Sequence, residues 1–465
     1  MRQFLAVALR FLHDTGRARK VETESGGYLR SPGKRNMIGI GIIGLGTVGR
    51  GTYDILEKHR RLIEQKTGLD IAVLGAAEID PGRRKDLRTD DPGFFREASD
   101  LINDPSIRII VELIGGTGAA YDLITDALRK DKWVVTANKA LLAEKGNELL
   151  NLAAERGCEI GFEASVCGGI PVIRAIRDGL VGNRIDYILG ILNGTSNYIL
   201  SRMSEEGLPF DRALYEAQAA GFAESNPGLD IDGIDAAHKL CILARLAFGF
   251  PMSMSDIGTG GISRIEPIDI EFAREFGYKI KLLAVAKEEN GVIEARVEPA
   301  MLPVRHLMSD VNGVFNAVYV EGDEVGPNLY YGKGAGAYPT GSAVVSDIVD
   351  MAARIGSGCV KPGMRLGEGG RRIKRSAETV TPFYMRVKAE DSPGVLSRIS
   401  GILASYNISI FAVTQKGRKE RDFVPIVMLT YEATEEHLKR AKADIDRLPF
   451  VQGESVHIRI EAGGL

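Results

Sequence analysis

The chain has few of the residues that build disulfide frameworks, zinc sites or nucleic-acid interfaces. Its 4 cysteines and 6 histidines are dispersed without C-x-x-C spacing, which argues against a disulfide framework or a zinc site and favours reduced thiols in a cytoplasmic protein. A net charge of -3 argues against nucleic-acid binding, because phosphate recognition requires a basic surface. No apolar run approaches the roughly 18 residues of a membrane helix, so we expect no membrane partner.

The apolar content is sufficient for several folded units. With 465 residues, of which 44% are hydrophobic, the chain is long enough for roughly three domains. Residues 1–36 are rich in arginine and have few apolar positions after Leu12, which predicts a disordered N-terminal extension. They lack the apolar region of a secretory signal. An amphipathic transit peptide, or a start codon assigned upstream of a true start at Met37, would also explain them.

A glycine-rich turn follows the first apolar strand. Residues 38–43 run into Gly44-Leu-Gly46-Thr-Val-Gly49, and a helical stretch then continues to about Lys66. In this context Gly44 permits a tight turn, Gly46 lets the backbone approach a pyrophosphate, and Gly49 allows close packing of helix and strand. The helix N-terminus favours the phosphate charge. The pattern predicts a Rossmann domain that binds a dinucleotide.

The second strand, residues 71–77, leaves the choice of coenzyme open. Glu78 and Asp80 suit the ribose hydroxyls of NAD, whereas the basic residues 83–85 suit the 2′-phosphate of NADP. The acids lie further from Gly49 than is usual for a ribose-binding residue. The sequence therefore favours NADP slightly.

Two further strands are expected to end at the same edge of a parallel sheet. Residues 109–114 lead into Gly115-Gly-Thr117, and residues 133–136 lead into Asn138-Lys139. Ligands of such sheets bind at the carboxyl edge. Lys139 is therefore either an ordinary lysine at a helix start or a functional cation beside the nicotinamide.

Four carboxylates crowd the segment before a helical lysine. They are Glu224, Asp230, Asp232 and Asp235, and the lysine is Lys239. Asp232 is predicted to cap the helix, and Asp235 and Lys239 fall on one face at i and i+4. Because so many acids repel one another unless they face water, a cation or a positively charged ligand, the segment is predicted to form an active site. A solvated surface ion pair is the alternative.

The remaining chain predicts an α/β catalytic domain and a small C-terminal unit. A loop over residues 331–340 is expected to approach a ligand, and the helix at 342–355 is expected to pack back onto the nucleotide domain. From Phe383 onward the pattern is that of a βαββαβ unit. The predicted divisions are an extension at 1–36, a Rossmann domain at 37–164, a catalytic domain at 165–355, a linker at 356–380 and a regulatory domain at 381–465.

From Met37 onward these residues resemble the homoserine dehydrogenase family. The motifs that carry the resemblance are the glycine-rich turn, Glu-Leu-Ile-Gly-Gly at 112–116, Thr-Ala-Asn-Lys at 136–139, Ile-Leu-Asn-Gly-Thr-Ser-Asn-Tyr at 191–198 and the block from Glu224 to Lys239. The C-terminal unit, with its Asp391-Ser-Pro-Gly-Val-Leu turn, looks like an ACT domain, which senses amino acids.

The resemblance implies a reaction and roles for the acidic segment. The family interconverts aspartate 4-semialdehyde and homoserine with NAD or NADP, a step towards threonine, methionine and isoleucine. Charge develops on the carbonyl oxygen, so an ammonium stabilises it and supplies the proton. The implied catalytic residues are Lys239, Lys139 and Asp235, and the implied substrate-binding residues are Glu224, Asp230, Asp235 and Lys239.

The family's coenzyme and cation sites carry over in the same way. The implied coenzyme-binding residues are Gly44, Gly46, Thr47, Val48, Gly49, Gly116, Thr117, Lys139, Gly221, Gly334 and Gly336. A monovalent cation, usually sodium, is implied at Glu163 and at the backbone carbonyls of Val166, Gly168 and Ile170, since hard oxygen ligands suit such an ion. Cys167, within this loop, stands where many relatives have a small residue.

The ACT resemblance implies regulation and assembly. Threonine is the expected effector, bound near Asp391, Gly394, Val395 and Leu396, and a homodimer or homotetramer is expected because ACT units commonly pair. Two rival hypotheses remain: a dehydrogenase with another amino-acid substrate, and a sensor without catalytic activity. The acidic segment argues against the first, and intact Lys139, Asp235 and Lys239 argue against the second.

Overall fold

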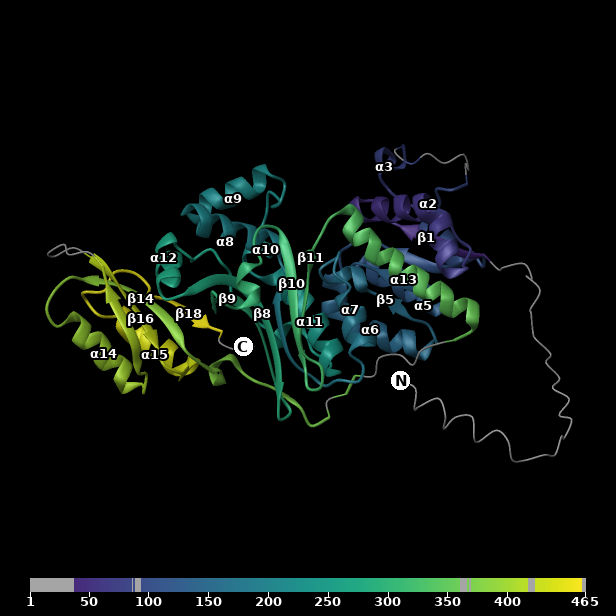
Figure 1. Ribbon diagram of the computed structural model, residues 1–465. Helices are drawn as coiled ribbons and strands as arrows, with labels where there is room; N and C mark the ends of the chain where they lie inside the picture. The colour runs from purple at the N-terminus through teal and green to yellow at the C-terminus, as the bar shows by residue number, and fades with distance from the viewer. Residues whose placement is uncertain are drawn as a thin grey trace, which may run out of the picture. The chain divides into compact units, whose positions relative to one another are not determined.

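A computed structural model describes residues 37–85, 87, 93–359, 366–367, 369–416 and 423–461. The predicted extension at 1–36 and part of the predicted linker lie outside these residues. Figure 1 labels the helices and strands.

The first sheet is the predicted nucleotide-binding sheet. Its five strands run parallel in the order β2-β1-β3-β4-β5, and their side chains are mostly buried. A parallel sheet covered on both faces requires such apolar strands. The strands are β1 (Ile38–Ile43), β2 (Ile71–Ala77), β3 (Ile107–Glu112), β4 (Trp133–Thr136) and β5 (Ile160–Gly161). The helices of this unit are α2 (Thr47–Thr67), α3 (Pro81–Lys85), α4 (Ala98–Asn103), α5 (Ala119–Arg129) and α6 (Lys139–Glu155).

The catalytic unit is built on a second, largely antiparallel sheet. Its strands follow the order β11-β10-β6-β8-β9, and helices α8, α11 and α12 pack against β8. The strands are β6 (Ile185–Ile191), β7 (Gly258–Thr259), β8 (Tyr278–Glu289), β9 (Val292–Pro303), β10 (Phe315–Gly322) and β11 (Gly326–Lys333). The helices are α7 (Val172–Arg174), α8 (Gly194–Glu206), α9 (Phe210–Ala219), α10 (Gly228–Ile231), α11 (Ile234–Phe248) and α12 (Pro267–Glu275).

Helix α13 (Ala337–Ser357) returns to the nucleotide-binding unit as predicted and packs against α2 (Figure 1). Two glycines allow the close approach. A Cβ at Gly51 would overlap the carbonyl oxygen of Ala337, and a Cβ at Gly341 would lie 2.9 Å from the carbonyl carbon of Gly51. The helix begins five residues before the predicted start, since Pro339 fits its first turn. Of the predicted loop at 331–340, residues 337–340 are therefore helical, and residues 331–333 belong to β11.

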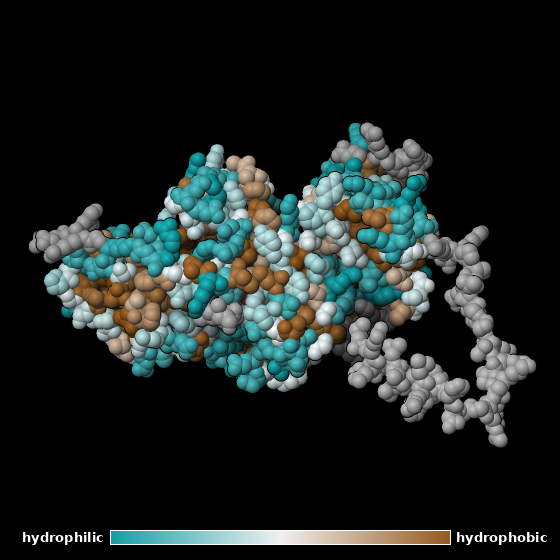
Figure 2. All heavy atoms as spheres, in the orientation of Figure 1, coloured by the Kyte–Doolittle hydropathy of each residue, from teal (hydrophilic) through white to brown (hydrophobic). Residues whose placement is uncertain are grey.

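The C-terminal unit has the predicted βαββαβ order and its own apolar core. Its sheet order, β18-β14-β16-β15, places the first and last strands side by side. The elements are β14 (Phe383–Glu390), α14 (Val395–Ser405), β15 (Ile410–Gln415), β16 (Phe423–Thr430), α15 (Glu435–Asp446) and β18 (Val456–Ile460). On the face seen in Figure 2, apolar residues form separate patches among hydrophilic ones, and one patch lies over this unit.

Strand pairing joins this unit to the catalytic unit. Strand β18 pairs in parallel with β9, Arg459 opposite Ala300, so that the two sheets are continuous. The segment predicted as a linker also contributes β12 (Arg372–Ile373), which pairs with β9. Neither pairing could be predicted from the local sequence pattern, because both join strands distant along the chain.

Candidate active site

Asp235 connects two lysines that come from different units. Its Oδ2 lies 2.7 Å from the Nζ of Lys239, one turn along α11, and its Oδ1 lies 3.0 Å from the Nζ of Lys139 at the start of α6. The Nζ of Lys239 also donates to the carbonyl oxygen of Leu192 at 2.6 Å. The side chain of Lys239 is 10% exposed and that of Lys139 is 41% exposed. The predicted i,i+4 pair is therefore nearly buried, not a solvated surface pair.

The electrostatics keep Lys239 charged. Burial alone raises the pKa of Asp235, but the ammonium groups of Lys239 and Lys139 outweigh burial and hold that pKa well below its usual range. Burial alone lowers the pKa of Lys239, but the Asp235 carboxylate outweighs it and raises that pKa above its ordinary value. A buried pair of this kind remains ionised because each charge stabilises the other.

Asn193 extends this group to Asp230. Its Nδ2 donates to Asp230 Oδ1 at 2.6 Å and to Asp235 Oδ2 at 2.8 Å, while its Oδ1 accepts from the backbone N–H of Ser196 and caps α8. Burial raises the pKa of Asp230, against the hydrogen bond from Asn193. Asn193 is absent from the residues predicted for the site. Its position at the end of a strand, in a polar turn, was the signal that could have identified it.

The acidic segment differs from the prediction in two places. Asp232 does not cap α11, because Gly233, with φ 82°, occupies the N-cap position and Asp232 closes the short helix α10. Asp235 still lies in the first turn of α11, where a negative charge is favourable. The side chain of Glu224 is exposed, and in the part of the chain that the structure describes no hydrogen bond or ion pair joins its carboxylate to Asp235.

The glycine-rich turn has the predicted geometry. Gly44 has φ 97°, Gly46 is the N-cap of α2, and a Cβ at Gly49 would overlap the carbonyl oxygen of Gly44. Thr47 and Val48 are the first residues of α2, so their backbone N–H groups are among the free donors of the helix N-terminus.

The end of β2 carries both an acid and a base beside this turn. The carboxylate of Glu78 accepts from the backbone N–H of Leu45 at 2.7 Å and from that of Asp80 at 2.9 Å. The Nη1 of Arg83 lies 3.7 Å from Glu78, and a Cβ added at Gly46 would lie 3.6 Å from it. Of the predicted basic residues 83–85, Arg83 is the one that reaches the turn at Gly46.

The loops after β3 and β4 meet. The side-chain Nδ2 of Asn138 donates to the carbonyl oxygen of Gly116 at 2.6 Å, and the hydroxyl of Thr136 donates to Glu112 at 2.7 Å. Gly116, with φ 77°, lies in a conformation that favours glycine. These bonds hold Gly116 and Thr117 beside the start of α6, and therefore near Lys139.

The remaining predicted coenzyme glycines lie elsewhere. Gly221 is exposed after α9. A Cβ at Gly334 would overlap the side chain of Asn316, and Gly336 is the N-cap of α13. A Cβ at Gly168 would lie 3.2 Å from the carbonyl oxygen of Gly334. The loop at 334–336 thus packs against the predicted cation loop.

The predicted cation loop surrounds a buried acid. The two carboxylate oxygens of Glu163 accept from the backbone N–H groups of Ile173 and Arg174, each at 2.9 Å. Burial, with Asp347 nearby, raises the pKa of Glu163 to about 7. Glu163 and Asp347 are two buried acids with one partly exposed arginine, Arg174, beside Asp347. A small monovalent cation fits this oxygen-rich donor set.

Val166, Gly168 and Ile170 lie in the loop that follows Glu163. Cys167 has φ 51°, a conformation that favours glycine, which is a physical reason for a small residue there. Within the described ranges no cluster of three or more His, Cys, Asp or Glu side chains could hold a metal ion.

The predicted effector turn lies between β14 and α14. Gly394, with φ 92°, is the N-cap of α14, and Asp391 Oδ1 accepts from the Nε2 of Gln415 at 3.0 Å. Val395 is buried and Leu396 is exposed. The turn thus has the local geometry that was expected.

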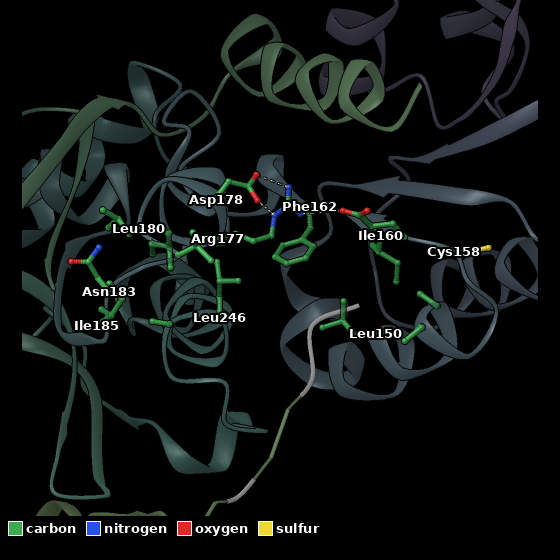
Figure 3. A pocket seen from close by; sticks show the side chains of 16 residues that line it. Leu150, Cys158, Ile160, Phe162, Arg177, Asp178, Leu180, Asn183, Ile185 and Leu246 are labelled. Carbon is green, nitrogen blue, oxygen red and sulfur yellow. Dashed lines mark hydrogen bonds and ion pairs between the residues drawn. The ribbon is translucent and has the colours of Figure 1, made fainter. Parts of the chain in front are cut away.

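A large cavity lies away from these groups. It has a volume of about 680 Å³ and opens between α6 and α11 (Figure 3). Leu150, Phe162 and Leu246 contribute apolar walls, and Arg177 pairs with Glu159 at 3.2 Å. None of the residues predicted for the active site lines it.

Of the helices that the structure describes, none is long and apolar enough to cross a membrane.

Sequence comparison assigns all three units. Residues 44–163 match the homoserine dehydrogenase NAD-binding domain, residues 171–349 match homoserine dehydrogenase, and residues 383–450 match the ACT domain. A homoserine dehydrogenase of Neisseria gonorrhoeae is 42% identical over 432 residues, which cover 91% of this chain and 99% of that protein. The enzyme of Helicobacter pylori is 43% identical over 430 residues, covering 92% of this chain and 100% of that protein.

Solved structures agree. A homoserine dehydrogenase from Thiobacillus denitrificans has a TM-score of 0.85 and 42% identity, covering 91% of this chain and 98% of that one. A hyperthermophilic archaeal homoserine dehydrogenase in complex with NADPH has a TM-score of 0.60 and 26% identity, covering 71% of this chain and 100% of that one. Relatives of 42% and 43% identity thus match more than nine-tenths of its length, and this chain belongs to the homoserine dehydrogenase family.

Proposed function

We propose that this protein reversibly converts aspartate 4-semialdehyde to homoserine with NADP, and that Lys239 supplies the proton. The observation that carries the proposal is the buried pair of Lys239 and Asp235, joined by Lys139 from the nucleotide-binding unit. The coenzyme, when bound, supplies the hydride or accepts it. Lys239 stabilises the developing charge on the substrate oxygen and donates a proton to it from Nζ.

Asp235 positions Lys239 and maintains its charge. Its Oδ2 accepts from both Lys239 and Asn193, which restricts the directions in which the ammonium can point. Lys139 neutralises the other carboxylate oxygen and is more exposed. Lys139 therefore lies where it can also contact the coenzyme, at the carboxyl edge of the parallel sheet.

The α-ammonium group of the substrate requires a negatively charged side chain to bind it. Asp230 is the best supported candidate because Asn193 holds its carboxylate beside the pair of Asp235 and Lys239. Glu224 lies on the exposed loop before α10, and it would have to turn inward when the substrate binds. Binding of the substrate ammonium would explain why a loop so rich in carboxylates lies beside Lys239 and Lys139.

NADP is proposed ahead of NAD because of Arg83. Both Glu78 carboxylate oxygens accept backbone N–H groups, and Arg83 lies between Glu78 and the turn at Gly46. A guanidinium in this place suits a 2′-phosphate. The coenzyme would lie along Gly44 to Gly49. The loop at Gly116 and Thr117, together with Lys139, would contact its nicotinamide end. The proposed remaining contacts are Gly221, Gly334 and Gly336.

A sodium ion would be held by Glu163 and the carbonyl oxygens of Val166, Gly168 and Ile170. The ion would supply a positive charge beside two buried acids and would hold the loop in one conformation. The proposal is supported by the oxygen donors at the loop and by the raised pKa of Glu163.

Threonine feedback is proposed at the turn from Asp391 to Leu396. Regulation of this kind would suit an enzyme early in the biosynthesis of threonine, methionine and isoleucine. Edge strand β15, where Phe411 is 62% exposed, supports pairing of two C-terminal units in a homodimer or homotetramer. An effector that favours a less active state by about 1 to 3 kcal/mol would inhibit roughly 5- to 150-fold.

The test is turnover of homoserine, followed by the absorbance of the reduced nicotinamide, with NADP and NAD compared. We expect activity with homoserine and a higher kcat/KM with NADP. Absence of turnover with either coenzyme would favour a different amino-acid substrate. Binding of coenzyme without turnover of any amino acid would favour the sensor hypothesis.

A further inference from the structure

A polar cleft lies where the C-terminal unit joins the catalytic unit. Its volume is about 570 Å³. Gly260, Gly261, residues 263–266, Glu298 and Pro299 line it from the catalytic unit, and Lys442 and residues 454–459 line it from the C-terminal unit. The active-site residues proposed above do not line it, and neither does the effector turn at Asp391 to Leu396.

Arg459, in the wall of this cleft, has one unused hydrogen-bonding group. The residue is 3% exposed. Its Nε lies 2.7 Å from Glu298 Oε1, and its Nη2 contacts Glu435 and the hydroxyl of Ser376. Its Nη1 is buried and, as far as the described residues go, has no hydrogen-bond partner. A buried donor without a partner is costly, so Nη1 is a ready donor for a ligand oxygen.

The other charged groups of the cleft make it suitable for a zwitterion. Lys442, 17% exposed, adds a second positive charge, and its Nζ already lies 2.9 Å from Asp446; the buried carboxylate of Glu298 adds a negative charge. Arg264 and Glu454 pair at 3.1 Å, one from each unit, and both are largely exposed. An anion alone would meet Glu298 and Glu454, and a cation alone would meet Arg459 and Lys442. A small molecule with both charges matches both signs.

The floor of the cleft contacts the turn before the catalytic helix. The backbone N–H of Gly260 donates to the carbonyl oxygen of Val297 on β9, and the N–H of Ile262 donates to that of Ile231 at the end of α10. A Cβ added at Gly261 would lie 2.7 Å from the same Ile231 oxygen. A Cβ added at Gly233, the N-cap of α11, would lie 3.2 Å from the carbonyl oxygen of Gly260. A displacement of this loop would therefore reach the helix that carries Asp235.

We infer that this cleft binds a free α-amino acid, with its carboxylate on Arg459 and Lys442 and its ammonium on Glu298. Occupancy of the cleft then acts on the active site through residues 260–262. The site is separate from the effector turn, so the chain has two places at which an amino acid can act. The effect on turnover rests on the proposed function, whereas binding does not.

Isothermal titration of the full chain with each standard L-amino acid tests the binding. Ser263 is an exposed residue of the lining, and the Ser263→Trp substitution fills the cleft. Ser99→Trp, at an exposed position of α4, is the matched control. Lys442→Gln removes a charge without filling the cleft. We expect at least one amino acid to bind the wild type, with Kd raised about 10-fold or more in both variants, because the indole of Ser263→Trp occupies the ligand's space and Lys442→Gln loses a charge-assisted contact.

Asp391→Ala distinguishes the two amino-acid sites. We expect binding at the cleft to survive this change in the effector turn and to survive Ser99→Trp. If no amino acid binds the wild type, or if binding is lost in Asp391→Ala and kept in Ser263→Trp, the assignment of the cleft is wrong.

Turnover of homoserine gives a separate measurement. We expect the amino acid that binds the cleft to change kcat/KM in the wild type and in Ser99→Trp but not in Ser263→Trp. If it binds the cleft without changing turnover, the coupling through residues 260–262 is wrong. If no variant or wild type turns over homoserine, the proposed function fails while the titration still decides whether the cleft is a binding site.

Discussion

At the residue scale, the centre of the site is one carboxylate shared by two lysines. Asp235 accepts from Lys239 and Asn193 and contacts Lys139, and these contacts bring together α11, α6 and the strand end before α8. Because Lys239 is buried, its charge would be costly without a partner, and Asp235 is that partner. The charge of Lys239 and its direction both depend on Asp235.

Removal of the ammonium should abolish most turnover while leaving coenzyme binding intact. In Lys239→Met the proton donor is lost, and we expect kcat to fall by about 10² to 10⁴. Steady-state kinetics with homoserine, together with fluorescence titration of the reduced coenzyme, would measure both effects. Lys145→Met, which breaks an exposed pair with Glu148 on α6, is the control and should retain activity. Near wild-type kcat in Lys239→Met would show that another group donates the proton.

Coenzyme choice should depend on Arg83. In Arg83→Gln we expect kcat/KM for NADP to fall about 10- to 100-fold, because a charge-assisted contact to the 2′-phosphate is worth about 1.5 to 3 kcal/mol. The value for NAD should change little. Arg61→Gln, at an exposed position of α2, is the control. An equal loss with both coenzymes would mean that Arg83 supports the fold and not the phosphate.

His457 should make the protein less stable in acid. Burial lowers its pKa from 6.5 to about 4. As pH falls through this window, the unfolded chain binds a proton that the folded chain does not, so folding stability is lost, by about 2 kcal/mol at pH 5. Urea unfolding at pH 8 and pH 5 should show a smaller loss for His457→Gln than for the wild type. An equal loss in both would assign the acid sensitivity to other groups.

At the element scale, close packing of α2 against α13 ties the nucleotide-binding unit to the end of the catalytic unit. The contact depends on glycines, since a Cβ at Gly51 would overlap the backbone at Ala337. Local sequence indicates both helices, but a glycine within a helix pattern does not reveal which partner needs the space.

Two glycine substitutions in these helices should have opposite effects. In Gly51→Ala the added methyl group meets the backbone of α13, and we expect the free energy of unfolding to fall by about 1 to 3 kcal/mol. Gly356→Ala lies in α13, where nothing is within 4 Å of the added Cβ, and should be neutral or stabilising by up to about 1 kcal/mol. Urea unfolding of both variants would compare them. Similar losses would indicate that intrinsic helix effects dominate.

At the scale of the whole molecule, the C-terminal unit is part of the second sheet and not an appended module. Strand β18 pairs with β9, and the carboxylate of Glu461 contacts the buried guanidinium of Arg296. Tyr384 and Arg386 of β14 both contact Asp269 of α12, at 2.8 Å and 2.7 Å. The proposed regulation would therefore act through contacts that also support the fold.

Removal of the C-terminal unit should destabilise the catalytic unit. Truncation before residue 380 removes Glu461, one of the three carboxylates that contact the buried guanidinium of Arg296, and exposes an edge of β9. We expect lower solubility and a lower unfolding temperature, measured by size-exclusion chromatography and calorimetry.

Truncation is thus a poor test of threonine feedback. Asp391→Ala in the full chain is better, and there threonine inhibition should weaken while basal kcat is retained.

Local sequence was sufficient for the Rossmann domain, the βαββαβ unit and the pair of Asp235 and Lys239. These features depend on short-range patterns: alternation, turn glycines and helical spacing. The capping role of Asp232 was wrong because Gly233 can adopt the left-handed conformation that the turn requires. The start of α13 was misplaced because a helix accepts a proline, here Pro339, in its first turn.

Only the tertiary structure decided which distant groups meet. Asn193 with Asp235, Lys139 with Asp235, and β18 with β9 are separated by long stretches of chain, and no local period reports such pairings. The Asp235 carboxylate that keeps the buried Lys239 charged, and the burial that leaves Arg459 with an unused donor, are likewise properties of the folded molecule. The sequence by itself determined the elements and the chemical groups; the folded structure determined which groups share a site, because proximity and desolvation arise only on packing.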